Sequence, residues 1–234
     1  MIRAIIWALF YLVMIPIIGI IGIPWTFIVG KVDWMYNAAM WAAFTGARIV
    51  GVKVDVHGLD RFDNSGTYIY MCNHVSNLDP PLVVPMVPKR SSVLVKKELF
   101  RIPILGKAMR MASFVPVDRS NRDAAIASIQ RAKEVMQSGV NITVFPEGTR
   151  SPDGKLLPFK KGPFHMAMES GMPVIPMTIY GTEKLMPKKT WKITKGTATL
   201  IFHSPMQPAD YSDREQLMDA VREKIASALP ESMK

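Results

Sequence analysis

The chain has 234 residues, enough for one substantial hydrophobic core in one or two domains. Its single cysteine, Cys72, excludes an intramolecular disulfide, gives no support to a zinc site and fits a reducing compartment. The net charge of +10 predicts an anionic partner, which is either nucleic acid or an anionic lipid surface. The mean hydropathy of +0.14 is high for a soluble nucleic-acid-binding protein, so we expect a lipid surface and no nucleic acid.

The N-terminal segment is strongly apolar. No charged side chain occurs from Ala4 to Gly30, a run long enough to cross a bilayer as a helix, although its internal prolines and glycines would kink or weaken that helix. The pattern of residues 33–50 favours a second, moderately amphipathic helix. The two helices either cross the membrane or dip into one leaflet and return. A cleaved signal peptide and a buried hairpin of a soluble protein are the alternatives to our prediction that residues 1–50 associate with a membrane.

Residues 51–234 alternate short β-branched runs with helical patterns, which predicts a single α/β domain with a mixed β-sheet flanked by helices. Strands are expected at residues 52–56, 67–72, from 93 onward, 141–145, 174–180 and 197–203. Helices are expected at residues 123–138 and 163–170, followed by a C-terminal helix that begins with a capping box of Ser212 and Glu215. Pro176 suggests that its strand lies at an edge of the sheet or pairs irregularly.

A histidine and an aspartate follow the strand expected at residues 67–72, in the sequence NHVSNLD. Residues at such strand-to-loop junctions are often functional. If the turn folds Asp79 back onto His74, the carboxylate fixes the tautomer of the imidazole and leaves its other nitrogen as a general base. This pair would match the base and its orienter in a serine-hydrolase triad, with the nucleophile supplied by the substrate. The alternative is a loop whose polar side chains only cap the next helix.

A second motif, FPEGTRS, follows the strand expected at residues 141–145. Gly148 would let the backbone approach a ligand closely, Arg150 would bind phosphate through two hydrogen bonds, and Glu147 would bind a polyol hydroxyl. A glutamate and an arginine beside a glycine turn also commonly form a surface ion pair. The position of the motif after a buried strand favours a ligand site.

Four basic residues occupy similar loop positions in the expected α/β domain. Lys96 and Lys97 follow one strand, and Arg119 follows a pair of valines in FVPVDRS. Each alone is typical of a solvated charge. Together with Arg150 they supply the positive charge that a phosphomonoester site requires.

Four blocks resemble, in this order, the motifs of the glycerolipid acyltransferase family, and the resemblance covers most of residues 70–180. They read NHVSNLD, FVPVDRS, FPEGTRS and VIPMTI, with KKELFRIPILG between the first two. The resemblance implies that His74 is the catalytic base and Asp79 its partner. It implies that substrate is bound by Arg119, Glu147, Gly148, Thr149 and Arg150, with phosphate contacted by Lys96 or, less readily, Lys97.

The resemblance also implies a reaction. A fatty acyl group would pass from acyl-CoA or acyl-ACP, as cosubstrate, to the free sn-2 hydroxyl of lysophosphatidate and give phosphatidate, without a cofactor or a metal. Thr149 favours this acceptor, since the glycerol-3-phosphate enzymes more often carry glycine there. Acceptors such as glycerol-3-phosphate or another lysophospholipid remain alternatives, and a non-catalytic basic peripheral membrane protein is the alternative of another class. We expect the catalytic domain on the cytoplasmic face of the cell membrane.

A late basic cluster is a candidate lipid-binding loop. It contains Trp191 among five lysines between Lys184 and Lys195. Lysines around a tryptophan suit anionic lipid head groups. A solvated loop with a buried Trp191 is the alternative.

Overall fold

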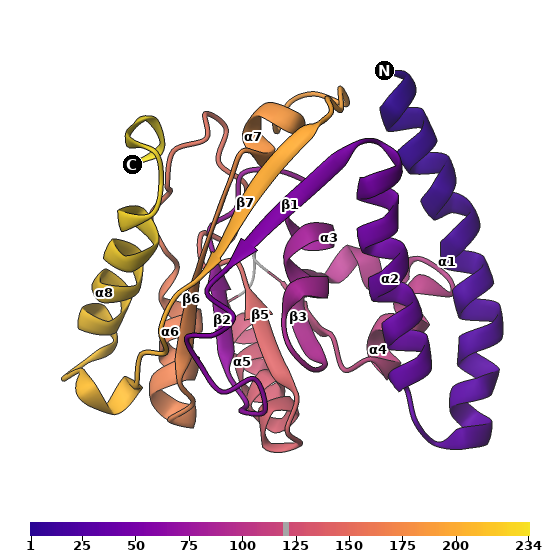
Figure 1. The fold of residues 1–234 in the computed structure, drawn as a ribbon. Helices are drawn as coiled ribbons and strands as arrows, with labels where there is room; N and C mark the ends of the chain where they lie inside the picture. The colour runs from indigo at the N-terminus through magenta and orange to yellow at the C-terminus, as the bar shows by residue number, and fades with distance from the viewer. Residues whose placement is uncertain (119–121) are drawn as a thin grey trace.

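Two long helices form one end of the protein. The computed structural model describes residues 1–118 and 122–234, and it begins with α1 (Ile2–Val29) and α2 (Asp33–Ile49), which run side by side (Figure 1). Gly22 and Gly46 allow this close approach, because a Cβ at Gly22 would lie 2.7 Å from Met35 and one at Gly46 2.8 Å from Tyr11. By length and composition, α1 is apolar enough to cross a membrane. The predicted pair of N-terminal helices is confirmed, and α1 continues through both of its prolines.

Within the described residues, seven strands form one mixed sheet, in the order β1-β7-β6-β2-β5-β3-β4. Neighbouring strands are parallel except β6 and β7, which are antiparallel. This arrangement confirms the predicted fold class. The strands are β1 (Val52–His57), β2 (Ile69–Cys72), β3 (Ser91–Lys96), β4 (Val115–Val117), β5 (Asn141–Val144), β6 (Val174–Tyr180) and β7 (Gly196–Phe202).

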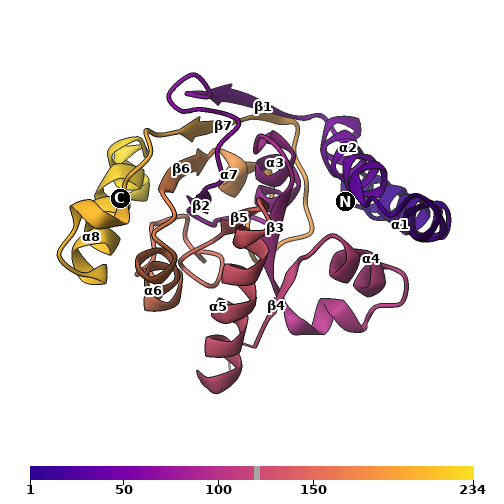
Figure 2. The same cartoon turned by 90° about the horizontal axis from the view of Figure 1, so that it is seen from below.

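The central strands are buried on both faces, as parallel strands in α/β proteins usually are. In β2, the side chains of Ile69 and Met71 join a core formed with α5 (Arg122–Gln137), α6 (Lys161–Ser170) and α8 (Arg214–Ser227). Tyr70 and Cys72 point the other way, into a second core with α2 and α3 (Asp79–Val83). Figure 2 shows α5, α6 and α8 together on one side, with α1 and α2 at the far end. The remaining α-helices in the described part of the chain are α4 (Leu105–Met111) and α7 (Thr182–Leu185).

Of the two alternatives predicted from Pro176, the edge strand is wrong, because β6 lies between β7 and β2, whereas the irregular pairing is confirmed. The ladder between β6 and β7 ends at the pair of Met177 and Phe202, one residue after the proline. The carbonyl of Pro176 accepts a hydrogen bond of 3.0 Å from His203 on that side. The nitrogen and the carbonyl of one strand residue point to the same side, so the nitrogen of Pro176 also faces β7. Proline has no N–H to donate, and none is needed there because the β6–β7 ladder ends at Met177.

The C-terminal helix is capped one residue later than predicted. Asp213, and not Ser212, is the N-cap of α8, and its carboxylate accepts a hydrogen bond of 2.8 Å from the backbone N–H of Gln216. Glu215 instead pairs with Lys161 at 3.0 Å. The side chain of Gln216 accepts in return from the backbone of Ser212, at 3.3 Å. Because the N–H that Gln216 accepts from belongs to the residue before the N-cap, only the N-cap half of a capping box is present, shifted by one residue.

Candidate active site

The turn after β2 brings His74 and Asp79 into contact. His74 Nδ1 lies 2.8 Å from Asp79 Oδ2, and Asp79 is the first residue of α3. The carboxylate is fully buried, whereas the His74 side chain is 15% exposed. Because a carboxylate accepts, Nδ1 carries the proton and Nε2 keeps its lone pair for a ligand. The ring stacks on Phe145, with centroids 4.3 Å apart, so the plane of the imidazole is fixed as well.

Several donors orient the carboxylate of Asp79. Its Oδ2 atom accepts from the backbone N–H groups of Val75 and Ser76, each at 2.7 Å. Its Oδ1 atom accepts from the hydroxyl of Thr182 at 2.6 Å. With three donors on its two oxygens, the carboxylate cannot rotate without losing hydrogen bonds. Asp79 is therefore held in the orientation in which it meets His74.

Sequence reasoning missed Thr182. The residue is fully buried at the start of α7, directly after β6 and Gly181. Gly181 has a φ of +92°, which favours glycine and turns the chain so that Thr182 faces Asp79. The position of a hydroxyl two residues after the VIPMTIY strand was the available signal.

Asn73 was also missed, and it anchors the residue before His74. Its fully buried amide donates to the carbonyl of Ile179 at 2.8 Å and accepts from the N–H of Ile179 at 2.8 Å. This pair joins the end of β2 to β6. Ser76 makes a comparable link, because its hydroxyl donates to the carbonyl of Met186 at 2.7 Å.

The FPEGTRS loop lies against the backbone of His74. Oε1 of Glu147 accepts from the N–H of His74 at 2.6 Å, and Oε2 accepts from the N–H of Leu157 at 3.0 Å. The N–H of Ser151 donates to the carbonyl of His74 at 2.8 Å. Burial raises the pKa of Glu147 to about 7 despite the two amide donors. The predicted contact of Glu147 with a substrate hydroxyl would require access to a carboxylate that is buried and already accepts two hydrogen bonds.

The other residues predicted in this loop lie nearer the surface. Gly148 has a φ of +70°, in the region that favours glycine, and its N–H donates to the carbonyl of Phe145 at 3.0 Å. Thr149 is exposed. Arg150 is half-buried, and its guanidinium lies 3.4 Å from the carbonyl of Lys188. In this loop, Glu147 thus lies against His74, whereas Thr149 and Arg150 lie toward solvent.

The predicted basic residues are not joined to His74. Lys96 is 64% exposed, and its amine lies 3.6 Å from the carboxylate of Glu98. Lys97 forms an ion pair with Asp118. Arg119 lies outside the described residues. Among the residues that are described, no hydrogen bond or ion pair connects Lys96 or Arg150 to His74.

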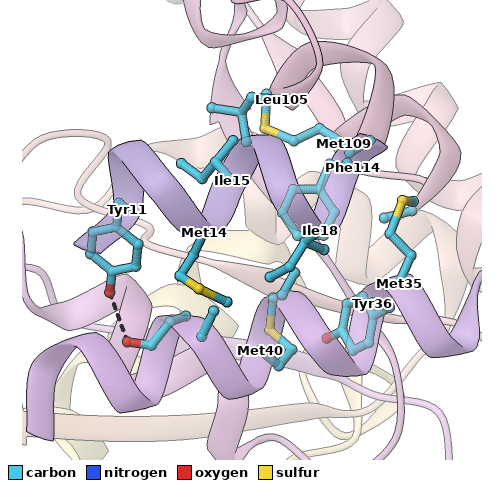
Figure 3. A pocket seen from close by; sticks show the side chains of 16 residues that line it. Tyr11, Met14, Ile15, Ile18, Met35, Tyr36, Met40, Leu105, Met109 and Phe114 are labelled. Carbon is cyan, nitrogen blue, oxygen red and sulfur yellow. Dashed lines mark hydrogen bonds between the residues drawn. The ribbon is translucent and has the colours of Figure 1, made fainter. Parts of the chain in front are cut away.

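Two cavities have linings that would suit apolar parts of a substrate. One, of about 320 Å³, is formed partly by Phe145, Pro146 and Gly148, and continues to Lys160 and Gly162 at the start of α6. The other, of about 230 Å³, lies between α1, α2 and α4. Figure 3 shows that aliphatic, methionine and aromatic side chains from the three helices point into it. In the part of the chain that the structure describes, no group of three or more His, Cys, Asp or Glu side chains is placed to hold a metal ion.

Comparisons with known proteins identify relatives of this fold and site. A family model described as Acyltransferase matches residues 53–180. The chain is 34% identical to the 1-acyl-sn-glycerol-3-phosphate acyltransferase of Cocos nucifera, covering 80% of this chain and 61% of that protein. It is 30% identical to the enzyme of that name from Limnanthes alba, covering 84% and 69%. The crystal structure of the LPA acyltransferase PlsC from Thermotoga maritima superposes with a TM-score of 0.81 at 28% identity, covering 97% of this chain and 92% of that one.

Proposed function

The chain belongs to the acyltransferase family, and from this premise we propose that it transfers a fatty acyl group from an acyl thioester to the sn-2 hydroxyl of lysophosphatidate, giving phosphatidate. The family match confirms the resemblance of the four sequence motifs. The observation that carries the proposal is the contact of 2.8 Å between His74 and a buried Asp79, which leaves Nε2 of the imidazole for a substrate. The choice of lysophosphatidate as the acceptor rests on the names of the relatives, which are 1-acyl-sn-glycerol-3-phosphate acyltransferases.

His74 acts as general base in the proposed mechanism. Its Nε2 atom takes the proton of the acceptor hydroxyl while the oxygen attacks the thioester carbonyl. The resulting imidazolium is stabilised by Asp79 through Nδ1. The tetrahedral oxyanion then collapses, the C–S bond breaks, and the imidazolium returns its proton to the departing thiolate. The hydroxyl of the acceptor is the nucleophile, so no nucleophile from the protein is required.

We propose that the acceptor phosphate binds the basic residues at the surface of the site. Lys96 is suited to this role because its amine is exposed and its neighbour Glu98 lies at the long distance of 3.6 Å. Arg150 and Arg119 are the other proposed phosphate ligands. Gly148 and Thr149 lie beside Arg150 in the exposed part of the loop, where we propose that they contact the glycerol backbone.

The apolar cavities support a substrate with hydrocarbon chains. Burying each methylene of such a chain contributes roughly 0.8 kcal/mol. The cavity beside Phe145 lies next to the stacked ring of His74, and the cavity between α1, α2 and α4 is lined almost wholly by apolar side chains. The donor is acyl-CoA or acyl-ACP in this proposal, because both present a thioester to the base.

We further propose that residues 1–50 bind the membrane and that residues 51–234 form the catalytic domain on the cytoplasmic face. Trp191 is 65% exposed, which disagrees with a solvated loop built around a buried tryptophan and suits a loop that meets lipid. Large apolar side chains are exposed along the N-terminal helices, including Ile5, Leu9, Leu12, Val13, Ile20, Phe27, Trp34 and Trp41. So large an apolar surface is costly in water and favours a lipid environment.

An acceptor assay tests the proposed function. The purified protein would be incubated in mixed micelles with labelled acyl-CoA or acyl-ACP and, in parallel, with lysophosphatidate, glycerol-3-phosphate or lysophosphatidylcholine. We expect labelled phosphatidate, formed at least roughly 100-fold more slowly by the His74→Ala variant. Product with glycerol-3-phosphate alone would overturn the assigned acceptor. Absence of any product, with vesicle binding retained, would indicate a non-catalytic membrane protein instead.

A further inference from the structure

Glu147 is placed to hold the catalytic histidine. Its side chain is only 1% exposed, and each carboxylate oxygen accepts a hydrogen bond from a backbone N–H group. Each oxygen keeps a second lone pair, but the burial of the side chain leaves a substrate hydroxyl no access to it unless one of these donors is displaced. A displaced N–H group would be left buried without a partner, which costs roughly 1–3 kcal/mol.

The loop of Glu147 holds His74 by both of its backbone polar groups. Glu147 accepts from the N–H at 2.6 Å, and the N–H of Ser151 donates to the carbonyl at 2.8 Å. His74 lies beyond the end of β2, yet its N–H and carbonyl are both paired, as they would be beside a neighbouring strand. The position of the imidazole therefore depends on a loop about 70 residues further along the chain.

The same carboxylate also fixes the segment that returns toward α6. Oε2 of Glu147 accepts from Leu157, and the N–H of Lys160 donates to the carbonyl of Pro146 at 2.8 Å. The flanking side chains of Leu156 and Phe159 are buried in the core that contains α5, α6 and α8. The side chain of Glu147 thus joins the His74 turn, its own loop and a segment anchored in the core.

We propose that Glu147 is a positioning residue that fixes the backbone of His74, in place of contacting the acceptor. This inference rests on the proposed function and deepens it. If the two hydrogen bonds are lost, the turn is free to move and Nε2 leaves its place beside the acceptor hydroxyl. A displacement of about 1 Å at a reacting group costs up to roughly 100-fold in rate. Acceptor affinity should be unaffected, because no hydrogen bond or ion pair joins Glu147 to Lys96 or Arg150, the two proposed phosphate ligands that lie within the described residues.

The test uses Glu147→Gln, which keeps the shape of the side chain but sets an amide NH₂ group against one backbone N–H. Asn141→Ala is the matched control. Asn141 is also fully buried and also joins two segments, accepting from the N–H of Tyr68 at 2.9 Å and donating to the carbonyl of Pro88 at 2.8 Å. It begins β5, whereas Glu147 follows the end of that strand. Both variants lose buried hydrogen bonds, but only one of them loosens His74.

Two measurements on the full-length variants decide the question. With acyl-CoA and lysophosphatidate in mixed micelles, we expect the kcat of Glu147→Gln to fall roughly 10- to 100-fold, with the KM for lysophosphatidate within about twofold. Hydrogen exchange without substrate should be faster at the amide of His74 in this variant than in wild type or Asn141→Ala. Glu147→Asp, which is one methylene too short to reach both donors, serves if Glu147→Gln does not fold.

Other outcomes separate the two proposals. A raised KM with kcat and exchange unchanged would make Glu147 an acceptor contact and overturn the inference. An equal loss of kcat in Asn141→Ala would reduce the effect to general destabilisation and would overturn it too. If the wild-type protein acylates no acceptor, the proposed function fails, while the exchange rate at His74 still decides whether Glu147 holds that residue.

Discussion

The hydroxyl of Thr182 supports the proposed catalytic pair of His74 and Asp79 through Asp79, and removing it should weaken both folding and catalysis. In Thr182→Val a methyl group replaces the hydroxyl, and Oδ1 of the buried Asp79 loses a donor at 2.6 Å. A hydrogen bond to a charged group contributes roughly 1.5–3 kcal/mol. For a chain of this size that loss corresponds to a decrease in Tm of roughly 3–12 °C.

The effect on catalysis comes from the freedom that Asp79 gains. Without Thr182, the carboxylate is free to rotate away from Nδ1 of His74, and roughly 1.4 kcal/mol of lost orientation reduces kcat tenfold. Thermal melts in detergent and acyl-transfer assays at saturating lysophosphatidate measure the two effects. Thr182→Ser is the control, because it keeps the hydroxyl and loses only a methyl group worth about 1 kcal/mol.

Unchanged Tm and kcat in Thr182→Val would refute the idea that this bond holds Asp79. Loss of Tm without loss of kcat would show that the bond supports the fold alone. Equal losses of kcat in the valine and serine variants would show that the hydroxyl supports catalysis no more than the packing of this side chain does, since only serine keeps the hydroxyl.

Three further outcomes are expected. His74→Ala should reduce acyl transfer at least roughly 100-fold while vesicle binding, measured by flotation, is retained. Glu147 has a pKa raised from 4.5 to about 7, so between these values the folded state binds more protons than the unfolded state. The free energy of unfolding should therefore fall by about 3 kcal/mol as the pH rises through this range, and Glu147→Gln should remove that slope in urea titrations at several pH values. Lys96→Ala should raise the KM for lysophosphatidate roughly tenfold with kcat retained; Lys97→Ala, which breaks the pair with Asp118, tests whether any nearby lysine has the same effect.

Much of the fold was predictable from local patterns. The apolar run and the β-branched runs gave the N-terminal helices and most strand positions, because burial on one face or both leaves a regular pattern in the sequence. The order of the strands was not predictable, since it depends on pairings between distant segments. Pro176 shows why: its place inside the sheet is tolerated only because the ladder with β7 ends beside it.

The candidate site shows the same division. The motif containing His74 and Asp79 is local, so the sequence indicated their contact. Thr182 and Asn73 act across separations of 103 and 106 residues, and no short motif records such pairs. The direction of Glu147 could not be predicted either, because it is set by the return of the chain at Leu157.

The amide of Asn73 allows the chain to change direction without leaving the sheet unpaired. A strand that bends away normally exposes the N–H and carbonyl of its neighbour, and here the side chain supplies both partners for Ile179. The backbone of the next residue, His74, is then free to follow a different path. An aspartate at position 73 would present a second acceptor to the carbonyl of Ile179. Asn73 thus keeps the sheet paired while the main chain turns away at His74, the proposed general base.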